Sequence, residues 1–448
     1  MFSCPSRRWG AALALVLTGC AGFSPDGAVG PVAKATHERL GLELPSGRSD
    51  KDHQAHAARV DALLSQPLSA DAAVQVALLQ NPGLQASLAE LGIAEADMVQ
   101  AGRVANPAIS VGRLRRGSEV EIEFGMHLNL GQLITMPWAL PLERERLQRM
   151  QWQATLQVLG VAHATRRAYV DAVAEEESVR YLEQALDAAG AGAELARRMA
   201  EAGQWSALKR MREESLHADT ALALARGRQA RASAREALAR ALGVSGEHLA
   251  FRLPERLPDL PDTLPERPSL EQRAMDTRLD LRAARHDVEI AAQQLGLAAV
   301  VRWVNLLEIG ALHKRSNEAP AQRGVEIRFE LPLFDFGGVR EARGRAVYEQ
   351  AVARASQAAL EAQSQVRDAW QRARNRHAIA LRYRDEIVPL RQRMAQENLL
   401  RYNAMQIGVF DLLADAREQI ATVNAALDAR RDYWLADADL EMSLAGPY

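Results

Sequence analysis

The sequence predicts a mainly α-helical protein with a transmembrane β-barrel portion, built from two structural repeats that each combine a β-hairpin with long coiled-coil helices. Three observations support this fold class. Similar blocks recur about 200 residues apart, which indicates a duplicated half. Short stretches alternate strictly between apolar and polar residues, and runs of helical periodicity extend much farther than the helices of globular domains.

The composition is that of a folded protein, with 48% apolar and 25% charged residues in a chain of 448. A formal net charge of -2 provides no basic excess to follow a phosphate backbone, so nucleic acid is not expected as a partner. The sequence contains no Gly-rich phosphate loop and no nucleophile elbow. We therefore expect no enzyme activity, no cofactor and no bound metal.

Residues 1–19 are predicted to be a secretory signal peptide, because two arginines precede the apolar stretch Ala11–Leu17, which is too short to span a bilayer. The stretch ends in Leu-Thr-Gly-Cys, which resembles the lipobox of bacterial lipoproteins. The resemblance implies cleavage before Cys20 and attachment of lipid to its thiol. The alternative is an ordinary cleavage site between small residues. With Cys4 removed and Cys20 acylated, the mature chain keeps no free thiol and no disulfide is expected.

The mature chain divides into an arm, two repeats and a connector. Residues 20–67 mix Gly, Pro and Ser with charges and are expected to form a lipidated, extended arm. The first repeat spans 68–250 and the second 270–448. The connector 251–269 carries five prolines and cannot be helical. Each repeat opens with a helix-like block, at 68–103 and at 270–302.

Four segments alternate between apolar and polar residues, and we predict strands at about 106–114, 120–130, 303–312 and 324–333. About ten residues of such alternation suit a tilted transmembrane strand, because lipid wets one face and water the other. A single strand of this kind is better explained by a sheet over a soluble core, whereas two hairpins with polar turns favour the membrane. The polar positions supply the candidate lumen residues Glu121, Glu123, His127, Glu326, Arg328 and Glu330.

The number of strands makes an oligomer necessary. Four strands cannot close a lipid-facing barrel with an open lumen, and an unpaired sheet edge is not tolerated in hydrocarbon. Several chains must therefore share one barrel. The turns at 115–119 and 313–323 are hydrophilic, as extracellular loops are expected to be.

Long helices follow each hairpin. Apolar residues step alternately by four and three from Val352 to Ala373, and the same register resumes after Arg376. This heptad pattern predicts a coiled-coil run from Gly338 to Tyr402, on the order of 100 Å long. Pro389 predicts a kink or an interruption within it. The other long runs are expected at 142–202, 206–242 and 411–442.

Several segments resemble the outer membrane factor (TolC-like) family, and the resemblance covers nearly the whole mature chain. The most specific match is Leu-Pro-Leu-Phe-Asp-Phe-Gly-Gly-Val-Arg at 331–340, where the second repeat passes from strand to helix. One position departs from the family pattern, because Met405 stands where the family usually has glycine, so the alignment of this turn can shift. The other matching segments are 68–84 and 278–284 in the opening helices, and 202–206 and 402–416 at the turns between long helices.

The resemblance implies a homotrimer with a 12-stranded barrel in the outer membrane and an α-helical barrel that crosses the periplasm. It implies the exit channel of a tripartite efflux or secretion system, with a periplasmic adaptor protein, an inner-membrane pump and outer-membrane lipid as partners. Such channels close at the periplasmic end by coiled coils and rings of charge. Asp411 and Asp415 are the candidate gate residues. The alternative is that an acid in a first helical turn merely complements the helix dipole.

Two other classes of function remain open at this stage. A periplasmic coiled-coil adaptor lipoprotein would explain the lipobox and the heptads, although it needs no lipid-facing strands. A copper- or silver-binding enzyme or chaperone would use soft ligands, but helix-spaced methionines more often pack in a core. We expect the pair His53 and His56, and the run 175–177 of three glutamates, to be solvated. The methionines concerned are Met136, Met199, Met211, Met394 and Met405.

Overall fold

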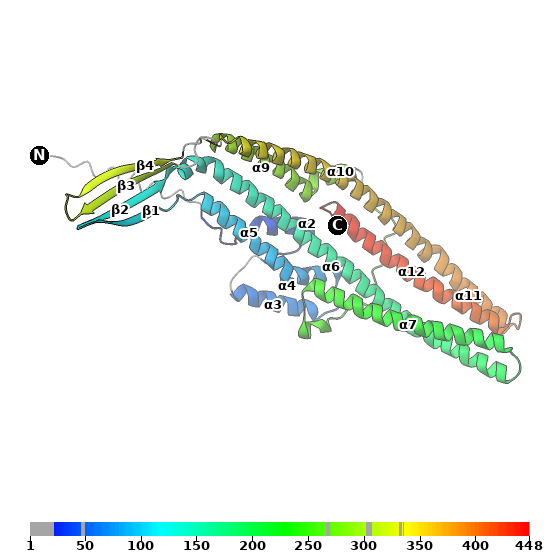
Figure 1. The fold of residues 1–448 in the computed structure, drawn as a ribbon. Helices are drawn as coiled ribbons and strands as arrows, with labels where there is room; N and C mark the ends of the chain where they lie inside the picture. The colour runs from blue at the N-terminus through cyan, green and yellow to red at the C-terminus, as the bar shows by residue number, and fades with distance from the viewer. Residues whose placement is uncertain are drawn as a thin grey trace. The chain divides into compact units, whose positions relative to one another are not determined.

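The structure is a computed structural model, and it shows two compact units that each combine segments from both predicted repeats (Figure 1). The signal peptide 1–19, Cys20 and Leu331–Leu333 lie outside the described residues. Unit 1 contains the described residues up to Val32, Ser87–Ala154 and Leu279–Ala359, and unit 2 contains Ala33–Ala86, Thr155–Arg278 and Leu360–Tyr448. The described residues are 22–45, 50–265, 269–301, 307–330, 334 and 336–447.

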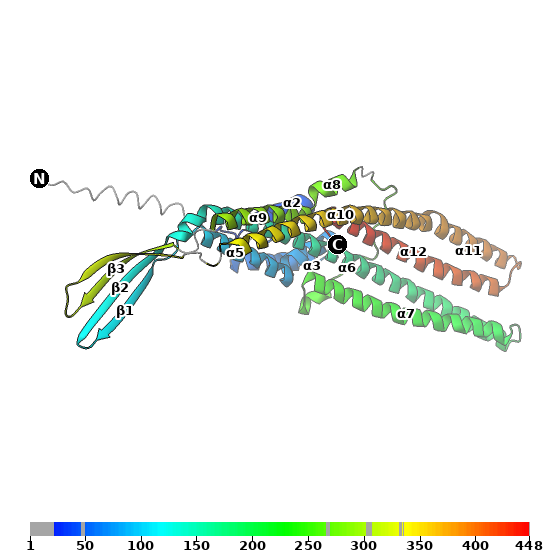
Figure 2. The same cartoon turned by 45° about the horizontal axis from the view of Figure 1, so that its top comes forward.

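Unit 1 contains a four-stranded antiparallel sheet in the order β1-β2-β3-β4 (Figures 1 and 2). Each repeat contributes one hairpin, and β2 pairs with β3 to join the two hairpins, with His127 opposite Gly310. The strands are β1 (Ala108–Arg116), β2 (Glu119–Asn129), β3 (Leu307–Ser316) and β4 (Gln322–Phe329).

In both hairpins the paired strands include residues that were predicted to be turns. Only Gly117 and Ser118 separate β1 from β2, and Gly117 has the positive φ of 61° that such a tight turn needs. In the second hairpin the strands continue to Ser316 and resume at Gln322. The sequence placed the strand ends too far from the turns, because the backbone ladder persists where both faces carry polar side chains, and there the alternation disappears.

The expectation of an irregular N-terminal arm is wrong, because the arm contains two helices, α2 (Gly30–Leu40) and α3 (Asp50–Leu64). Val60 of α3 is fully buried in the main core of unit 2. His53 and His56 therefore lie on a helix. Few apolar residues mark these helices, so their stability comes from packing against the rest of the chain, which a local pattern cannot reveal.

Each predicted opening helix is broken in two. Pro82 cannot continue a helix from Asn81, whose ψ of 114° ends α4 (Ala70–Gln80) and whose side-chain oxygen accepts a hydrogen bond from the Leu84 N–H of α5 (Pro82–Ala101) at 3.1 Å. The second repeat has the same break, because α8 (Leu270–Thr277) ends before Arg278 and α9 (Leu279–Val301) follows.

The first long helix, α6 (Leu130–Glu201), has 72 residues and begins well before the predicted Leu142. Its length corresponds to about 110 Å at 1.5 Å per residue. It returns through α7 (Ala207–Leu242), in which Ser206 caps the first turn by accepting from the Lys209 N–H. The corresponding returning helix of the second repeat is α12 (Val409–Ser443).

Pro389 interrupts the second long run as predicted. The run consists of α10 (Gly338–Arg382), a π-helical turn η3 (Tyr383–Ile387) and α11 (Val388–Asn403). The Val388 N–H bonds to the Tyr383 carbonyl, five residues earlier, so the wide turn leaves space for the proline ring that an α-helical turn would not.

The heptad seam of the second run is buried over only part of its length. Ala362, Val366, Ala369, Ala373 and Ala380 are buried within unit 2, and His377 occupies the seam position after the predicted break. His377 Nε2 donates to the Pro261 carbonyl at 2.7 Å. Outside this stretch the seam is open, since Val352, Leu390 and Met394 are exposed.

The described part of the connector packs against the helices of unit 2. Leu257 and Leu260 are buried, and the Pro258 carbonyl accepts a hydrogen bond from Trp434 Nε1 at 3.1 Å. Beside it, the glutamates 175–177 contradict the expectation of a solvated face. All three are half-buried, and they pair with Arg431, Arg231 and Arg430 respectively.

Candidate functional site

One face of the sheet is apolar and uncovered. The pairing register places Ile109, Met126, Ala311 and Val325 side by side across the four strands. The exposed fraction is 76% for Ile109 and 73% for Val325, whereas a sheet over a soluble core would bury them. Exposed patches of this kind mark an interaction with lipid or another protein. The other exposed apolar residues of this face are Val111, Ile122, Phe124, Met126, Ile309, Ile327 and Phe329.

The opposite face carries paired charges. Lys314 of β3 lies 3.7 Å from Glu121 and 3.5 Å from Glu123 on β2. Arg328 of β4 lies 3.1 Å from Glu308 and 3.3 Å from Glu326. The structure thus brings the predicted lumen residues within the strands onto one face, whereas Glu330 lies just beyond the end of β4 and is exposed. Lys314 lies on the same face, although the sequence analysis expected it in the turn 313–323.

His127 crosses the sheet over two glycines. Its Nδ1 lies 3.9 Å from a Glu326 oxygen on β4, two strands away, and its Nε2 lies 3.3 Å from the Ser110 hydroxyl on β1. A Cβ added at Gly310 would sit 2.5 Å from the imidazole, and one at Gly125 would sit 2.7 Å from it. The two glycines therefore provide the space that lets one histidine link the outer strands, and glycines at polar positions were the signal that the sequence offered.

The turns between the long helices have the same backbone in both repeats. Gly203 has a φ of 73° and Met405 a φ of 60°. The next residue closes the turn in each case, with Gln204 N–H donating to Met199 and Gln406 N–H donating to Arg401. Met405 therefore occupies the turn position that Gly203 holds in the first repeat. A side chain there costs about 1–2 kcal/mol.

The two turns pack side by side within unit 2. Lys209 Nζ lies 5.8 Å from the Trp205 ring centroid and 5.4 Å from that of Phe410, and the two rings meet edge-on at 6.0 Å. Behind them Glu213, which is 1% exposed, pairs with Arg417 at 3.1 Å. A buried carboxylate depends on such a partner, so this end of unit 2 is fixed by charge as well as by aromatic packing.

Comparison with solved structures identifies the fold. The outer-membrane channel OprN is 19% identical, with 87% of this chain and 92% of that chain covered and a TM-score of 0.70. The outer membrane protein VceC of Vibrio cholerae is 17% identical, with 89% of this chain and 99% of that chain covered and a TM-score of 0.69. The chain has the fold of outer-membrane channels. The open-state channel MtrE of Neisseria gonorrhoeae supports this channel fold at 17% identity, 84% and 88% coverage and a TM-score of 0.70.

The family resemblance of the sequence is confirmed at the level of this channel fold. No protein-family model and no curated protein matches the chain. Across the described ranges, none of the helices combines the length and apolar character needed to cross a membrane.

Asp411 and Asp415 lie in the first turns of α12 of the channel fold. The Asp411 carboxylate accepts a hydrogen bond from the Gly408 N–H at 3.1 Å, which is a helix-capping contact. Asp411 is exposed and Asp415 is half-buried. Both lie near the end of unit 2 at which the turns pack.

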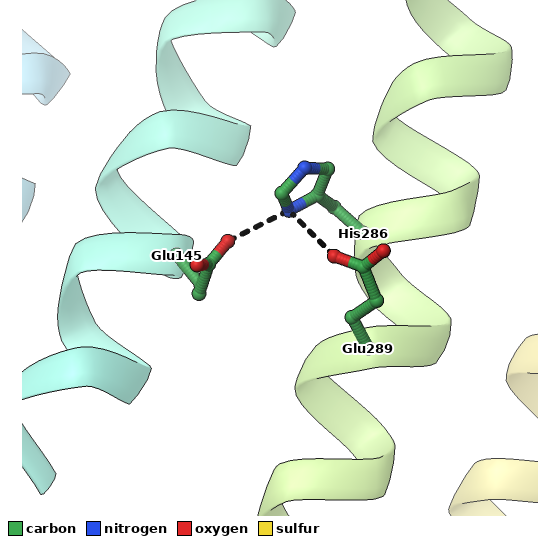
Figure 3. A group of neighbouring side chains, drawn as sticks. All are labelled: Glu145, His286 and Glu289. Carbon is green, nitrogen blue, oxygen red and sulfur yellow. Dashed lines mark ion pairs between the residues drawn. The ribbon is translucent and has the colours of Figure 1, made fainter.

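A separate cluster links α6 to α9 within unit 1 (Figure 3). His286 Nδ1 lies 2.8 Å from Glu145 Oε2 and 3.4 Å from Glu289 Oε2, and the Trp152 ring meets the imidazole at 4.4 Å. The three side chains offer one ligand atom each within 4.8 Å of one another. His286 thus pairs with two carboxylates and joins α6 to α9. Spacing along the sequence did not reveal it, because the two helices come from different repeats.

Arg278 is almost completely buried in unit 2, with 1% of its surface exposed. Its guanidinium donates to the Ser443 carbonyl and to Gln365 Oε1, both at 3.0 Å. Ser443 ends α12, so Arg278 satisfies a carbonyl that the helix itself leaves without a partner. The sequence placed Arg278 in a family-like segment but assigned it no role.

The ion-paired carboxylate of Asp439 is expected to make the stability of the folded protein fall in acid. Burial opposes ionisation of its carboxyl, but hydrogen bonds from His163 at 2.8 Å and Arg167 at 2.5 Å outweigh it and hold its pKa below the ordinary 3.8. A lowered folded-state pKa contributes stability above pH 3.8, and this contribution is lost as the pH falls through the folded value.

Asp439→Asn is therefore expected to lower the thermal unfolding midpoint at neutral pH and to flatten its decline in acid. The measurement is the midpoint as a function of pH for the purified protein. Asp219→Asn, an exposed acid on α7, is the control and should follow the unmodified protein. Equal acid dependence in all three proteins would contradict the assignment.

Proposed function

We propose that the chain is one subunit of a homotrimeric outer-membrane channel of a tripartite efflux or secretion system. The sheet carries this proposal, because one face exposes apolar side chains while the other holds ion pairs. β1 and β4 lie at the ends of the strand order, and unpaired strand edges are not tolerated in hydrocarbon, so neighbouring copies must complete the sheet. Three copies of four strands give 3 × 4 = 12 strands, a wider barrel than the eight-stranded ones that side chains fill.

The proposed path leads from an inner-membrane pump through a periplasmic adaptor into the channel and out of the cell. The likeness to OprN, VceC and MtrE supports the channel end of this path. The long hairpins α6–α7 and α10–α12 supply coiled-coil surfaces for an adaptor, and the exposed seam residues around α11 suit packing against other helices. The exported substrate is set by the pump and is not encoded in the features described above.

A periplasmic adaptor is the second candidate, and the sheet argues against it. An adaptor has no use for an uncovered apolar face on two hairpins, and it normally carries one long helical hairpin instead of two. We also propose that Cys20 is lipidated, which would anchor the N-terminus in the outer membrane. Acyl chains contribute about 0.8 kcal/mol for each buried CH₂.

Deletion of the gene tests the proposal. The deletion strain should become hypersensitive to one class in a panel of copper, silver, zinc, cobalt, dyes and antibiotics, and the protein should fractionate with outer-membrane porins as a heat-resistant trimer. A soluble monomer after removal of the acyl group would favour the adaptor. Unchanged sensitivity to the whole panel would contradict an export role for these compounds.

The charged face of the sheet is proposed to line the lumen. Under threefold symmetry Glu121, Glu123, His127, Glu326 and Arg328 would each form a ring of three. Lys314 and Arg328 pair with four glutamates, Glu121, Glu123, Glu308 and Glu326, so acids outnumber bases among these pairs. The barrel is therefore expected to favour cations over anions.

Asp411 and Asp415 are the proposed gate residues, and asparagine variants separate this role from helix capping. Asp411→Asn keeps an oxygen that accepts from the Gly408 N–H but removes the charge. If the acids hold the closed end, Asp411→Asn and Asp415→Asn should both raise the conductance of the closed channel in planar bilayers. If Asp411→Asn conducts as the unmodified channel and only Asp411→Ala loses stability, by about 1 kcal/mol, Asp411 is a helix cap and not a gate residue.

A further inference from the structure

The apolar face of the sheet becomes basic toward the hairpin turns. The register places Val111, Phe124, His313 and Arg323 in one row across the strands. The next row holds Ile122 between Arg113 and Arg315, and Arg115 lies opposite Val120. We call these five residues the basic rim: Arg113, Arg115, His313, Arg315 and Arg323.

The charges of the rim differ from those of the opposite face. There, Lys314 and Arg328 each pair with two glutamates. The four arginines of the rim are exposed, and within the described residues none of them pairs with a carboxylate. No Asp or Glu of the four strands shares their face. The rim is therefore a concentration of positive charge that the chain itself does not neutralise.

The position of the rim defines the partner. It borders the exposed side chains of Val111 and Phe124, which are proposed to contact acyl chains. It lies at the hairpin turns, whereas the other end of β2 continues directly into α6. If the helices enter the periplasm, the turns and the rim lie at the outer leaflet. A ligand with acyl chains below and anionic groups above fits this surface.

We propose that the basic rim binds the phosphate groups of the phosphorylated glycolipid of the outer leaflet, lipopolysaccharide. Guanidinium groups bind phosphate through paired hydrogen bonds, and arginine side chains extend from an apolar band toward the headgroups. In a trimer the four arginines of each chain would form a belt of 4 × 3 = 12 around the barrel. The proposal rests on the proposed channel function, because it requires this face to contact lipid.

The test compares two triple variants with equal loss of charge on opposite faces. The rim variant is Arg113→Gln, Arg315→Gln and Arg323→Gln. The control is Arg116→Gln, Lys314→Gln and Arg328→Gln, on the polar face. Trimers purified in detergent are titrated with lipopolysaccharide, and binding is followed by the rise in the temperature at which the trimer dissociates and by the lipid retained per trimer.

The rim variant should bind lipopolysaccharide on the order of a hundredfold more weakly, because each basic residue near an anionic surface contributes about a factor of five. The control should bind as the unmodified trimer does. If the rim triple does not assemble, Arg323→Gln alone should weaken binding about fivefold. Equal binding by the rim variant and the unmodified trimer would overturn the proposal.

Further arms distinguish the source of the phosphate. Dephosphorylated lipopolysaccharide and vesicles of phosphatidylcholine should give little stabilisation. If inorganic phosphate stabilised the trimer as strongly as lipopolysaccharide, the rim would be a phosphate site and the proposal would be wrong. The channel proposal is judged separately, by whether the unmodified chain forms trimers and restores export in the deletion strain, which the rim variant should also do.

Discussion

Val325→Arg is expected to prevent the trimer from accumulating in the outer membrane. Val325 lies in the middle row of the apolar face and is 73% exposed in the single chain. An arginine facing lipid between the headgroups and the midplane costs about 1–4 kcal/mol, and threefold symmetry repeats that cost three times. The sum is comparable to the whole stability of an ordinary domain. The measurement is the heat-resistant trimer band in isolated outer membranes.

Gly324→Arg is the matched control, because it places the same side chain one residue away on the opposite face. Gly324 has a negative φ and nothing within 4 Å of an added Cβ, so the backbone there accepts a side chain without strain. Trimers should accumulate normally for this variant. Normal accumulation of Val325→Arg would instead show that the apolar face does not contact lipid, and the channel interpretation would fail.

The sequence could predict which side chains of a strand share a face, because a strand has only two faces. Once Val120 to Leu130 alternate, the side of the sheet on which Glu121 and His127 lie is fixed. The same pattern could not give the pairing of β2 with β3, which joins residues nearly 200 apart. The contact of His127 with Glu326 over Gly310 follows from that pairing, and so it appears only in the structure.

The parts that the sequence did not predict depend on contacts between distant segments. α2 and α3 have little periodicity of their own, and Val60 is buried by residues of other helices. The pairing of Glu213 with Arg417 also joins helices from different repeats. Long-range contacts of this kind leave no local spacing to detect, whereas the interruption at Pro389 acts within a few residues and was predicted from the sequence.

Arg278→Met is expected to destabilise unit 2 strongly. The substitution keeps an unbranched side chain of similar reach but removes the donors to the Ser443 carbonyl and the Gln365 side chain. Each buried acceptor left without a donor costs about 1–3 kcal/mol. The measurement is the midpoint of guanidinium unfolding followed by tryptophan fluorescence, since Trp370 packs against α8.

Arg273→Met distinguishes the buried contacts from the loss of a positive charge. Arg273 lies on the neighbouring helix α8 and is exposed, so its replacement should leave the midpoint nearly unchanged. Arg278→Lys should be intermediate, because an ammonium group keeps the charge but cannot reproduce the planar arrangement of donors that reaches two acceptors. If Arg278→Met and Arg273→Met unfolded at the same midpoint, the end of α12 would not depend on Arg278.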